Sequence, residues 1–250
     1  MTNIILCGCN GKMGRYVTSG VESRDDINII AGVDLYDGIP NKYPVYKSIA
    51  DITEKADVVI DFSNPSALQS VLDYCKANSA GLVECTTGLS EDQVKTLDAA
   101  GKVIPVFRSG NMSLGINLVI ELAKTAAKVL GDSFDIEVVE AHHNQKLDAP
   151  SGTAYMIADA VKDVLSEDVE YEYNRHDKSE KRPHNEIGIH SIRGGTIVGE
   201  HEIIFAGNDE IVSISHSARS KALFSTGAIN AAIFISGKEP GLYAMKDLLK

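Results

Sequence analysis

The segment from Glu140 to Ala154, EAHHNQKLDAPSGTA, holds the side chains of this sequence best suited to acid–base chemistry. It contains two adjacent histidines, His142 and His143, and a lysine, Lys146, four residues after the first histidine. Histidine gives and takes protons near neutral pH, and lysine supplies a positive point charge. We therefore expect this segment to deliver a proton to a small anionic substrate.

The end of the same segment is suited to binding a carboxylate. Ser151, Gly152 and Thr153 precede an apolar stretch with helical spacing, 154–161, so their amides lie near the start of a predicted helix. Free N–H groups and the helix dipole attract anions at such a terminus. The apolar stretch 134–139 before the segment predicts a strand, which places the histidines on the loop between strand and helix.

A second candidate site is the turn GCNGKMG, with glycines at positions 8, 11 and 14. In a strand–turn–helix unit such glycines allow a tight bend, the approach of a pyrophosphate and close helix packing. Asp34 ends the second predicted strand and could bind both ribose hydroxyls of NAD. The spacing departs from GxGxxG because Asn10 occupies the second glycine position, so a structural turn with Asp34 as a loop acid remains the alternative.

The elements around this turn predict a parallel sheet flanked by helices. Short apolar runs alternate with helical patterns through the first 110 residues, and their hydrophobicity is continuous, as in strands buried on both faces. The predicted strands are 3–8, 27–34, 57–62, 81–85 and 103–107. Pro65 is suited to the first turn of a helix over 65–78, and Ser90 with Gln93 forms a capping-box signature.

The pattern changes after Gly110. A long helix is predicted over 113–130, and a polar irregular stretch follows the histidine segment. Three runs with period-two alternation, 186–192, 200–206 and 210–217, predict an antiparallel meander whose second face is solvated or covered by a partner. A last helix is predicted over 224–236, ending at Gly237.

Composition narrows the function classes. The 250-residue chain carries 24 basic and 35 acidic residues, a net charge of -11, which argues against a nucleic-acid partner. No apolar run reaches the roughly 20 residues of a membrane span, and no signal peptide is recognised, so a cytoplasmic protein is expected. The four cysteines show no metal-ligand spacing and favour buried reduced thiols over a metal or redox site, and the histidines form no metal motif.

Taken together, these segments make the chain resemble the dihydrodipicolinate reductase family almost from end to end. The segment EAHHNQKLDAPSGTA is close to the family signature EAHHxxKxDAPSGTA, the most specific element. The opening turn resembles GxxGRMG, with Lys12 for the usual arginine. Further family-like segments are DFSNP (61–65), CTTG (85–88), SGNMSLGIN (109–117), RGGTIVGEHEIIF (193–205) and the C-terminal FSTGAINAAIFISGKEPGLYAMKDLL.

The resemblance implies an α/β protein with a Rossmann-like parallel-sheet domain and an α+β substrate domain built on a mixed sheet. The dinucleotide-binding domain would comprise 1–112 and 222–250, and the substrate-binding and oligomerisation domain 113–221, in a homotetramer. The implied reaction is NADH- or NADPH-dependent reduction of the cyclic dicarboxylate at the dihydrodipicolinate level to tetrahydrodipicolinate, a step of lysine and diaminopimelate biosynthesis.

The resemblance also implies a role for each site residue. His142 would be the general acid, with Lys146 as its cationic partner, and a substrate carboxylate would bind His143, Ser151, Gly152 and Thr153. Cofactor contacts would fall on Gly8, Cys9, Asn10, Gly11, Lys12, Met13, Asp34, Cys85, Thr86, Thr87, Ser109, Gly110, Asn111 and Met112. The chain departs from the family pattern at Cys85, Asn64 and Lys221.

Two other classes of function compete with this assignment. Other Rossmann oxidoreductases of small keto or amino acids share the first domain but lack the histidine segment. A non-catalytic dinucleotide sensor would not need His142 and Lys146. Asp34 also bears on the cofactor: its carboxylate disfavours the 2′-phosphate of NADPH, so NADH should bind at least as well.

Overall fold

The computed structural model describes residues 1–166 and 168–249, which divide into two compact units. Unit 1 comprises residues 1–113 and the described residues from 221 onward, and unit 2 comprises Leu114–Ser220. The chain leaves the first unit once and returns to it. Within the described residues, no helix has the length and apolarity required to cross a membrane.

Unit 1 is built on a seven-stranded parallel sheet in the order β12-β6-β5-β4-β1-β2-β3. Its strands are β1 (Thr2–Cys7), β2 (Ile27–Val33), β3 (Val45–Tyr46), β4 (Val58–Asp61), β5 (Gly81–Glu84), β6 (Pro105–Arg108) and β12 (Gly241–Tyr243). Every residue of β4 and β5 is buried, as the continuous apolar runs predict. The Rossmann-like sheet is confirmed, and the two shortest strands, β3 and β12, were not predicted.

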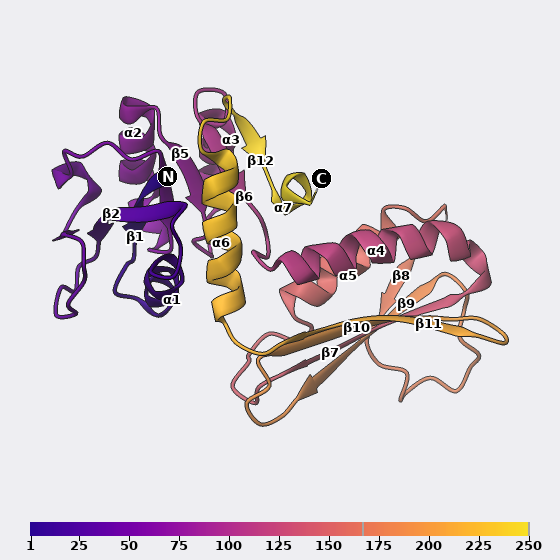
Figure 1. Cartoon of the computed structure of the whole chain (residues 1–250). Coiled ribbons are helices and arrows are strands. Elements are labelled where there is room, and N and C mark those ends of the chain that lie inside the picture. Colours follow the sequence, from indigo (N-terminus) through magenta and orange to yellow (C-terminus); the bar gives the residue numbers. More distant parts are fainter. Residues whose placement is uncertain (167, 250) are drawn as a thin grey trace. The chain divides into compact units, whose positions relative to one another are not determined.

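Helices cover both faces of this sheet (Figure 1). The helix α1 (Lys12–Val21) packs against α6 (Ala222–Ile235), while α2 (Leu68–Asn78) and α3 (Glu91–Ala100) form a core with alternate strand residues such as Val59 and Leu82. The predicted capping box begins α3, where Ser90 Oγ accepts from the Gln93 amide. Pro65 opens a 3-10 turn, η2 (Pro65–Ala67), that leads into α2, and a similar turn, η1 (Ile49–Asp51), precedes β4. The short helix α7 (Met245–Leu248) follows β12.

Unit 2 is a five-stranded mixed sheet in the order β11-β10-β7-β9-β8, with α4 and α5 along one face (Figure 1). The strands are β7 (Asp135–His142), β8 (Glu170–Glu172), β9 (Glu186–Arg193), β10 (Gly199–Ala206) and β11 (Ile211–Ala218); the helices are α4 (Leu114–Leu130), followed by a 3-10 turn, η3 (Gly131–Ser133), and α5 (Gly152–Lys162). Alternate residues of β7, β9 and β10 form a core with both helices, which includes Phe205 and Ile157. The predicted mixed sheet is confirmed.

The predicted antiparallel meander is wrong for its first strand. β10 and β11 form an antiparallel hairpin, but β7 lies between β10 and β9, antiparallel to the first and parallel to the second. β7 has buried positions through its length and fills the centre of the sheet, where both of its edges find backbone partners. A pattern of alternation cannot report such an insertion.

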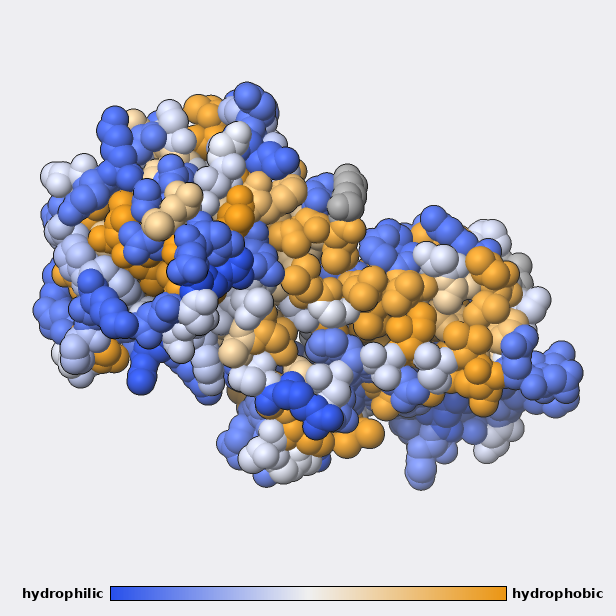
Figure 2. All heavy atoms as spheres, viewed as in Figure 1, coloured by the Kyte–Doolittle hydropathy of each residue, from blue (hydrophilic) through white to orange (hydrophobic). Residues whose placement is uncertain are grey.

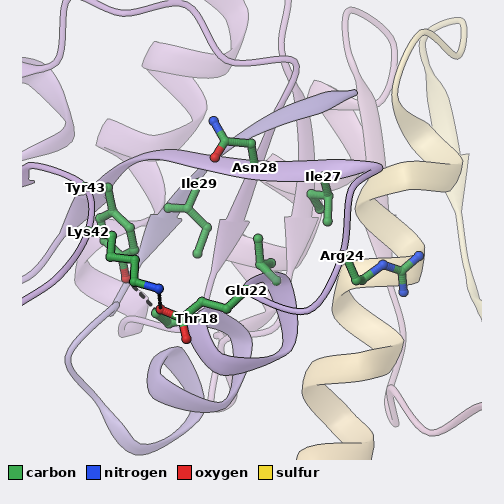
Figure 3. Close-up of a pocket in the computed structure, with 9 residues that line it drawn as sticks. Thr18, Glu22, Arg24, Ile27, Asn28, Ile29, Lys42 and Tyr43 are labelled. Atoms are coloured by element: carbon green, nitrogen blue, oxygen red, sulfur yellow. Dashed lines mark hydrogen bonds and ion pairs between the residues drawn. The ribbon is translucent and has the colours of Figure 1, made fainter.

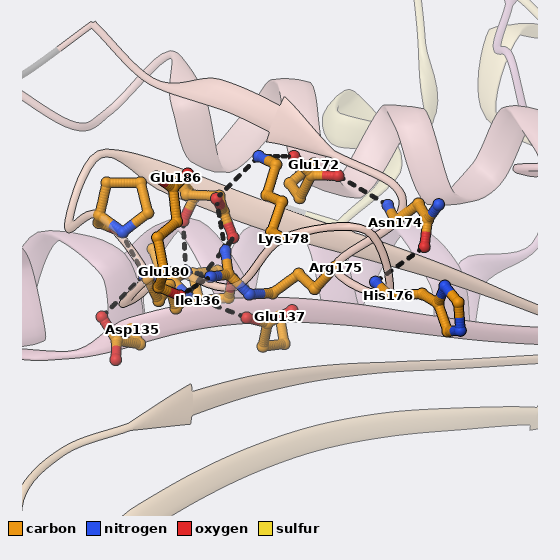
Figure 4. A network of polar contacts seen from close by, with 12 residues as sticks. Asp135, Ile136, Glu137, Glu172, Asn174, Arg175, His176, Lys178, Glu180 and Glu186 are labelled. Atoms are coloured by element: carbon orange, nitrogen blue, oxygen red, sulfur yellow. Dashed lines mark hydrogen bonds and ion pairs between the residues drawn. The ribbon is translucent and has the colours of Figure 1, made fainter.

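The polar stretch before β9 is tied to unit 2 by ion pairs (Figure 4). Arg175 donates to both oxygens of Glu186, whose side chain is 4% exposed, at 2.7 and 2.9 Å. Arg182 donates to Asp135 at 2.8 Å and to Glu137 at 3.0 Å, both on β7. A segment without regular secondary structure is thus held over the sheet by paired charges.

One helix of unit 2 keeps apolar side chains at its surface. Leu118 and Leu122 of α4 are 50% and 46% exposed, and Val129 near its end is 78% exposed. Figure 2 shows hydrophobic residues gathered over this helix.

Candidate active site

The predicted cofactor residues of unit 1 all lie beyond the carboxyl ends of parallel strands. The glycine turn follows β1, Asp34 follows β2, and the segments 85–87 and 109–112 follow β5 and β6. β1 lies between β2 and β4, so the connections run in opposite directions from this point. Open α/β sheets bind ligands at such a switch point.

The glycine turn meets the steric demands of a dinucleotide loop. Gly8 has φ +72°, and a Cβ on it would lie 2.6 Å from the Phe62 carbonyl oxygen. A Cβ on Gly14 would lie 2.6 Å from Cys9 Cα, so only glycine lets α1 approach the turn this closely. Gly11 is the N-cap of α1, whose first amides are available to an anion. These residues fit a pyrophosphate.

Asp34 is connected directly to this turn. Its Oδ2 accepts from the Asn10 amide at 2.9 Å, and its Oδ1 accepts from the Tyr36 amide at 3.0 Å. Asn10 is 8% exposed, donates to the Tyr36 carbonyl oxygen and accepts from Asn41 at 2.9 Å. The residue at the second glycine position therefore braces the loop after β2.

The remaining predicted cofactor residues differ in accessibility. Cys9 and Met112 are buried, whereas Lys12, Thr87 and Gly110 are exposed. The partly exposed ones are Met13, Cys85, Thr86, Ser109 and Asn111. The side chains of Cys9 and Met112 pack into the fold, so a contact between either residue and a dinucleotide would come from the backbone.

His142 is the last residue of β7 rather than a loop residue, which corrects the predicted boundary of that strand. Its Nδ1 lies 2.6 Å from Oε2 of Glu140, two residues earlier on the same face. A Cβ on Gly199 of β10 would lie 3.1 Å from the other ring nitrogen, Nε2. The glycine thus leaves space beside the nitrogen that would transfer the proton.

Glu140 is fully buried and is held by a guanidinium group. Arg193, at the end of β9, donates to Oε2 at 2.8 Å and to Oε1 at 2.7 Å, and the Ser151 amide donates to Oε1 at 3.1 Å. Burial raises the pKa of Glu140, but the hydrogen bonds from Arg193 and His142 outweigh it and bring the pKa to about 2. An ionised carboxylate only accepts hydrogen bonds, so the proton shared with His142 sits on Nδ1 of the imidazole.

The pKa of His142 reflects opposing influences. Burial lowers it below the usual value, the hydrogen bond and charge of Glu140 oppose that shift, and the charges of Lys146 and Arg193 add to it. Lys146 is therefore close enough to act on the imidazole, although its Nζ pairs with Asp148 Oδ1 at 2.9 Å. A bound anionic ligand would favour the imidazolium.

His201 on β10 completes a buried network beside His142. The two rings meet edge to face with centroids 5.2 Å apart, and His201 Nε2 lies 3.0 Å from Ser151 Oγ. Burial lowers the pKa of His201 to about 4, with a further contribution from His142. The ring is thus neutral at pH 7, and its contacts are packing against His142 and the hydrogen bond with Ser151.

The predicted carboxylate-binding turn begins α5. Ser151 is the N-cap, and its Oγ accepts from the Ala154 amide at 3.1 Å. Gly152 and Thr153 occupy the first turn, and a Cβ on Gly152 would have no neighbour within 4 Å. His143 follows His142 directly, and its Nδ1 is buried without a hydrogen-bond partner among the described residues. The structure therefore brings all the predicted unit 2 residues into one segment and the start of one helix.

Sequence reasoning missed Glu140 and Arg193 as working parts of this site. Glu140 begins the signature segment, and Arg193 begins a family-like segment 53 residues later. Both residues lie in family-like segments, which could have drawn attention to them. A sequence motif, however, does not show which residues are in contact.

The family models match both parts of the chain. The model described as "Dihydrodipicolinate reductase, N-terminus" matches residues 2–112, and the one described as "Dihydrodipicolinate reductase, C-terminus" matches residues 115–249. The chain belongs to the dihydrodipicolinate reductase family. The resemblance inferred from the sequence is confirmed.

Relatives in this family match over their full length. The 4-hydroxy-tetrahydrodipicolinate reductase of Caldanaerobacter subterraneus subsp. tengcongensis is 53% identical over 250 residues, which cover 100% of this chain and 99% of that protein. The enzyme of the same name from Clostridium novyi is 46% identical over 250 residues, with coverage of 100% and 99%.

Solved structures agree with the family assignment. The dipicolinate-bound dihydrodipicolinate reductase from Paenisporosarcina sp. TG-14 matches with a TM-score of 0.82 and 25% identity, over 98% of this chain and 97% of that one. A myo-inositol 2-dehydrogenase from Lactobacillus plantarum matches with a TM-score of 0.61 and 11% identity, over 100% and 93%, and shows the shared fold alone.

The departures from the family pattern lie at element boundaries. Cys85 follows β5, Asn64 caps η2 through its side chain, and Lys221 is the N-cap residue of α6. None of these residues belongs to the Glu140–Arg193–His142 network.

The pocket in Figure 3 is distinct from the predicted cofactor site of this family member. It has a volume of about 260 Å³ and lies between the end of α1 and the residues Ile27–Ile29 of β2. Lys42 pairs with Glu22 at 3.0 Å across it, and Thr18 lies 2.7 Å from the Tyr43 hydroxyl. Because it borders the amino-terminal half of β2, it lies away from the strand end that carries Asp34.

Among the residues that the structure describes, no cluster of three or more His, Cys, Asp or Glu side chains could hold a metal ion.

Proposed function

We propose that this chain catalyses the NADH- or NADPH-dependent reduction of the dihydrodipicolinate-level cyclic dicarboxylate derived from 4-hydroxy-tetrahydrodipicolinate, giving tetrahydrodipicolinate in lysine and diaminopimelate biosynthesis. The observation that carries the proposal is the Glu140–His142 pair at 2.6 Å, fixed by Arg193 within the family signature segment. When bound, a reduced nicotinamide would supply the hydride for this reduction. Unit 1 would bind the dinucleotide, and unit 2 would bind the substrate.

His142 would supply the proton that the reduction requires. Hydride addition to a conjugated C=C–C=N system places negative charge on the distal ring atoms, which must be neutralised as it forms. Glu140 fixes the tautomer, so Nε2 is the nitrogen that carries the transferred proton. General acid catalysis of this kind contributes roughly 10²- to 10⁴-fold to the rate.

The other unit 2 residues would bind the dicarboxylate. Lys146 would act by charge on the ring and its carboxylates, after exchange of its contact with Asp148 for the substrate. His143, Ser151 and the first-turn amides of Gly152 and Thr153 would hold one carboxylate at the start of α5. A dianion beside His142 would raise the lowered pKa of that imidazole toward 7, because it stabilises the protonated form.

The cofactor preference would depend on Asp34. Each oxygen of the Asp34 carboxylate accepts a hydrogen bond from one backbone amide and keeps a lone pair for a ribose hydroxyl. The 2′-phosphate of NADPH would be repelled by the negative charge of this carboxylate. The following residues, Leu35 and Tyr36, carry no positive charge. We infer use of both cofactors, with NADH at least as effective as NADPH.

Absorbance at 340 nm tests the reaction. The purified chain should oxidise NADH and NADPH only in the presence of freshly generated dihydrodipicolinate-synthase product, with kcat/KM for NADH equal to or above that for NADPH. No oxidation of either cofactor would refute the proposed function. A clear advantage for NADPH would refute only the preference and would show that the charge of Asp34 does not exclude the 2′-phosphate.

We also infer a homotetramer and a cytoplasmic location. The helices of unit 2 cover one face of its sheet, and the other face carries exposed apolar residues such as Ile192 and Ile211, at 52% and 68%. Packing this face against a partner copy would remove these apolar side chains from water. The described cysteines are all unpaired, which suits a reducing compartment.

A further inference from the structure

Two carboxylates with no role in the proposed chemistry are buried at the edge of the unit 1 sheet. Asp61 ends β4 and is 0% exposed, and Glu84 ends β5 and is 2% exposed. They are direct partners in the parallel register, so their side chains leave the same face of adjacent strands, whose backbones run about 4.8 Å apart. One oxygen of each, Asp61 Oδ2 and Glu84 Oε2, has no hydrogen-bond partner among the described residues.

The only basic side chain known to act on this pair, among the described residues, offsets its charge in part: the charge of Arg108 lowers the pKa of Glu84, but less than burial and Asp61 raise it. Within residues 1–166 and 168–249, neither carboxylate forms an ion pair, and the basic residue in register with Glu84 is Arg108 on β6, which is exposed. The other ionisable groups that act on the pair are thiols: Cys7 of β1, Cys75 of α2 and Cys85 after β5. Burial raises the pKa of all three thiols, so they stay neutral and cannot offset two negative charges.

Two adjacent buried carboxylates cannot both ionise at low cost. Burial and the charge of Asp61 raise the pKa of Glu84 to about 8, and burial also raises the pKa of Asp61. A single proton held by the pair would leave one negative charge instead of two on these adjacent strands.

Each carboxylate also holds the loop that follows it. Asp61 Oδ1 accepts from the amide and the hydroxyl of Ser63 at 2.8 and 2.5 Å, and Glu84 Oε1 accepts from the Thr86 amide at 2.8 Å. Thr86 Oγ1 in turn reaches the Asp61 carbonyl oxygen at 3.5 Å. The carbonyl of Phe62, between Asp61 and Ser63, is the group that Gly8 approaches in the glycine turn.

We propose that Asp61 and Glu84 share one proton at neutral pH and act as positioning residues that hold the loops after β4 and β5 in the form that binds the dinucleotide. This inference rests on the proposed function, because that function assigns the segment 85–87 to the cofactor. Loss of the shared proton would leave two negative charges on adjacent strands. Their repulsion would displace the two loops and weaken cofactor binding.

The first test is the dissociation constant of NADH, measured by fluorescence with the full chain from pH 6.5 to 9.5 at constant ionic strength. If only the singly protonated pair binds, the wild-type affinity should be about tenfold lower at pH 9 than at pH 7. Glu84→Gln, whose amide can donate to Asp61 permanently, should bind at pH 7 and keep its affinity at pH 9. The control Glu91→Gln, at an exposed position of α3, should follow the wild-type profile.

Equal pH dependence in the wild type and Glu84→Gln would overturn the inference, as would a folded Glu84→Gln protein that fails to bind at pH 7. If Glu84→Gln does not fold, Asp61→Asn takes its place in the test and should likewise bind NADH equally well at pH 7 and pH 9. Carbon-13 NMR of labelled glutamate gives a readout that is independent of the cofactor: one carboxyl should titrate near pH 8 and be missing in Glu84→Gln. Failure of the wild type to bind either cofactor at any pH would instead refute the proposed function.

Discussion

His142 takes its chemical properties from residues that are distant along the chain. Glu140 fixes its proton, but Glu140 is itself ionised because Arg193, 53 residues later, donates to both of its oxygens. Removing one member of such a buried network leaves the others without their partners. Two predictions follow from this arrangement at the scale of single residues.

His142→Gln should lower kcat by about 10²-fold or more, since the amide keeps a polar side chain but cannot act as an acid. The affinity for NADH should stay unchanged because the cofactor groups belong to unit 1. Steady-state kinetics and a binding titration measure the two quantities. His176→Gln, at a histidine that is 91% exposed, is the control and should behave as wild type; a near-normal kcat in His142→Gln would mean that another residue donates the proton.

Glu140→Gln should move the pH profile as well as the rate. The carboxylate raises the pKa of His142, so its neutral replacement should lower that pKa. An acid is active while protonated, and activity is lost as the pH rises through its pKa; the alkaline limb of kcat/KM should therefore move to lower pH. A shift of one unit would reduce the rate above the pKa about tenfold. The control is Glu137→Gln: Glu137 lies on β7, as Glu140 does, but its carboxylate is hydrogen-bonded to His190 of β9, so the alkaline limb should stay in place. An unmoved limb in Glu140→Gln would contradict the positioning role.

At the scale of elements, α5 is both a structural helix and the proposed carboxylate site. Ser151→Ala removes the N-cap and the contact with His201, which should lower the free energy of unfolding by about 1 kcal/mol and raise the substrate KM. Thermal denaturation and kinetics test both effects. Ser90→Ala removes the matching cap of α3 in unit 1 and should reduce stability without changing KM. The same change in KM for both variants would assign the effect to stability alone.

At the scale of the whole molecule, the open face of the unit 2 sheet should be covered by other copies of the chain. Light scattering at micromolar concentration should give four times the mass of the 250-residue chain. Ile192→Glu places a carboxylate on that face and should yield an oligomer of smaller mass, because burying an unpaired charge in the interface costs free energy. Val103→Glu, at a 60% exposed position in unit 1, is the control. A monomeric mass for the wild type would refute this assembly.

The sequence alone determined the class of the long, buried elements and the family to which the chain belongs. Continuous apolar runs predicted a parallel sheet because both faces of β4 and β5 are buried. The motif 140–154 identified the candidate acid, His142, and its lysine, because acid–base chemistry depends on residue type. Both are local properties that a linear pattern retains.

Only the tertiary structure decided which distant residues meet. The insertion of β7 between β9 and β10 brings Arg193 and His201 to Glu140 and His142, and the register of β4 with β5 sets Asp61 against Glu84. Strand order and register depend on how all the apolar faces are buried at once, and no single segment carries that information. The charge state of each buried carboxylate depends on these contacts, so Glu140 is held ionised by Arg193 while the pKa of Glu84, which has no such partner, is raised.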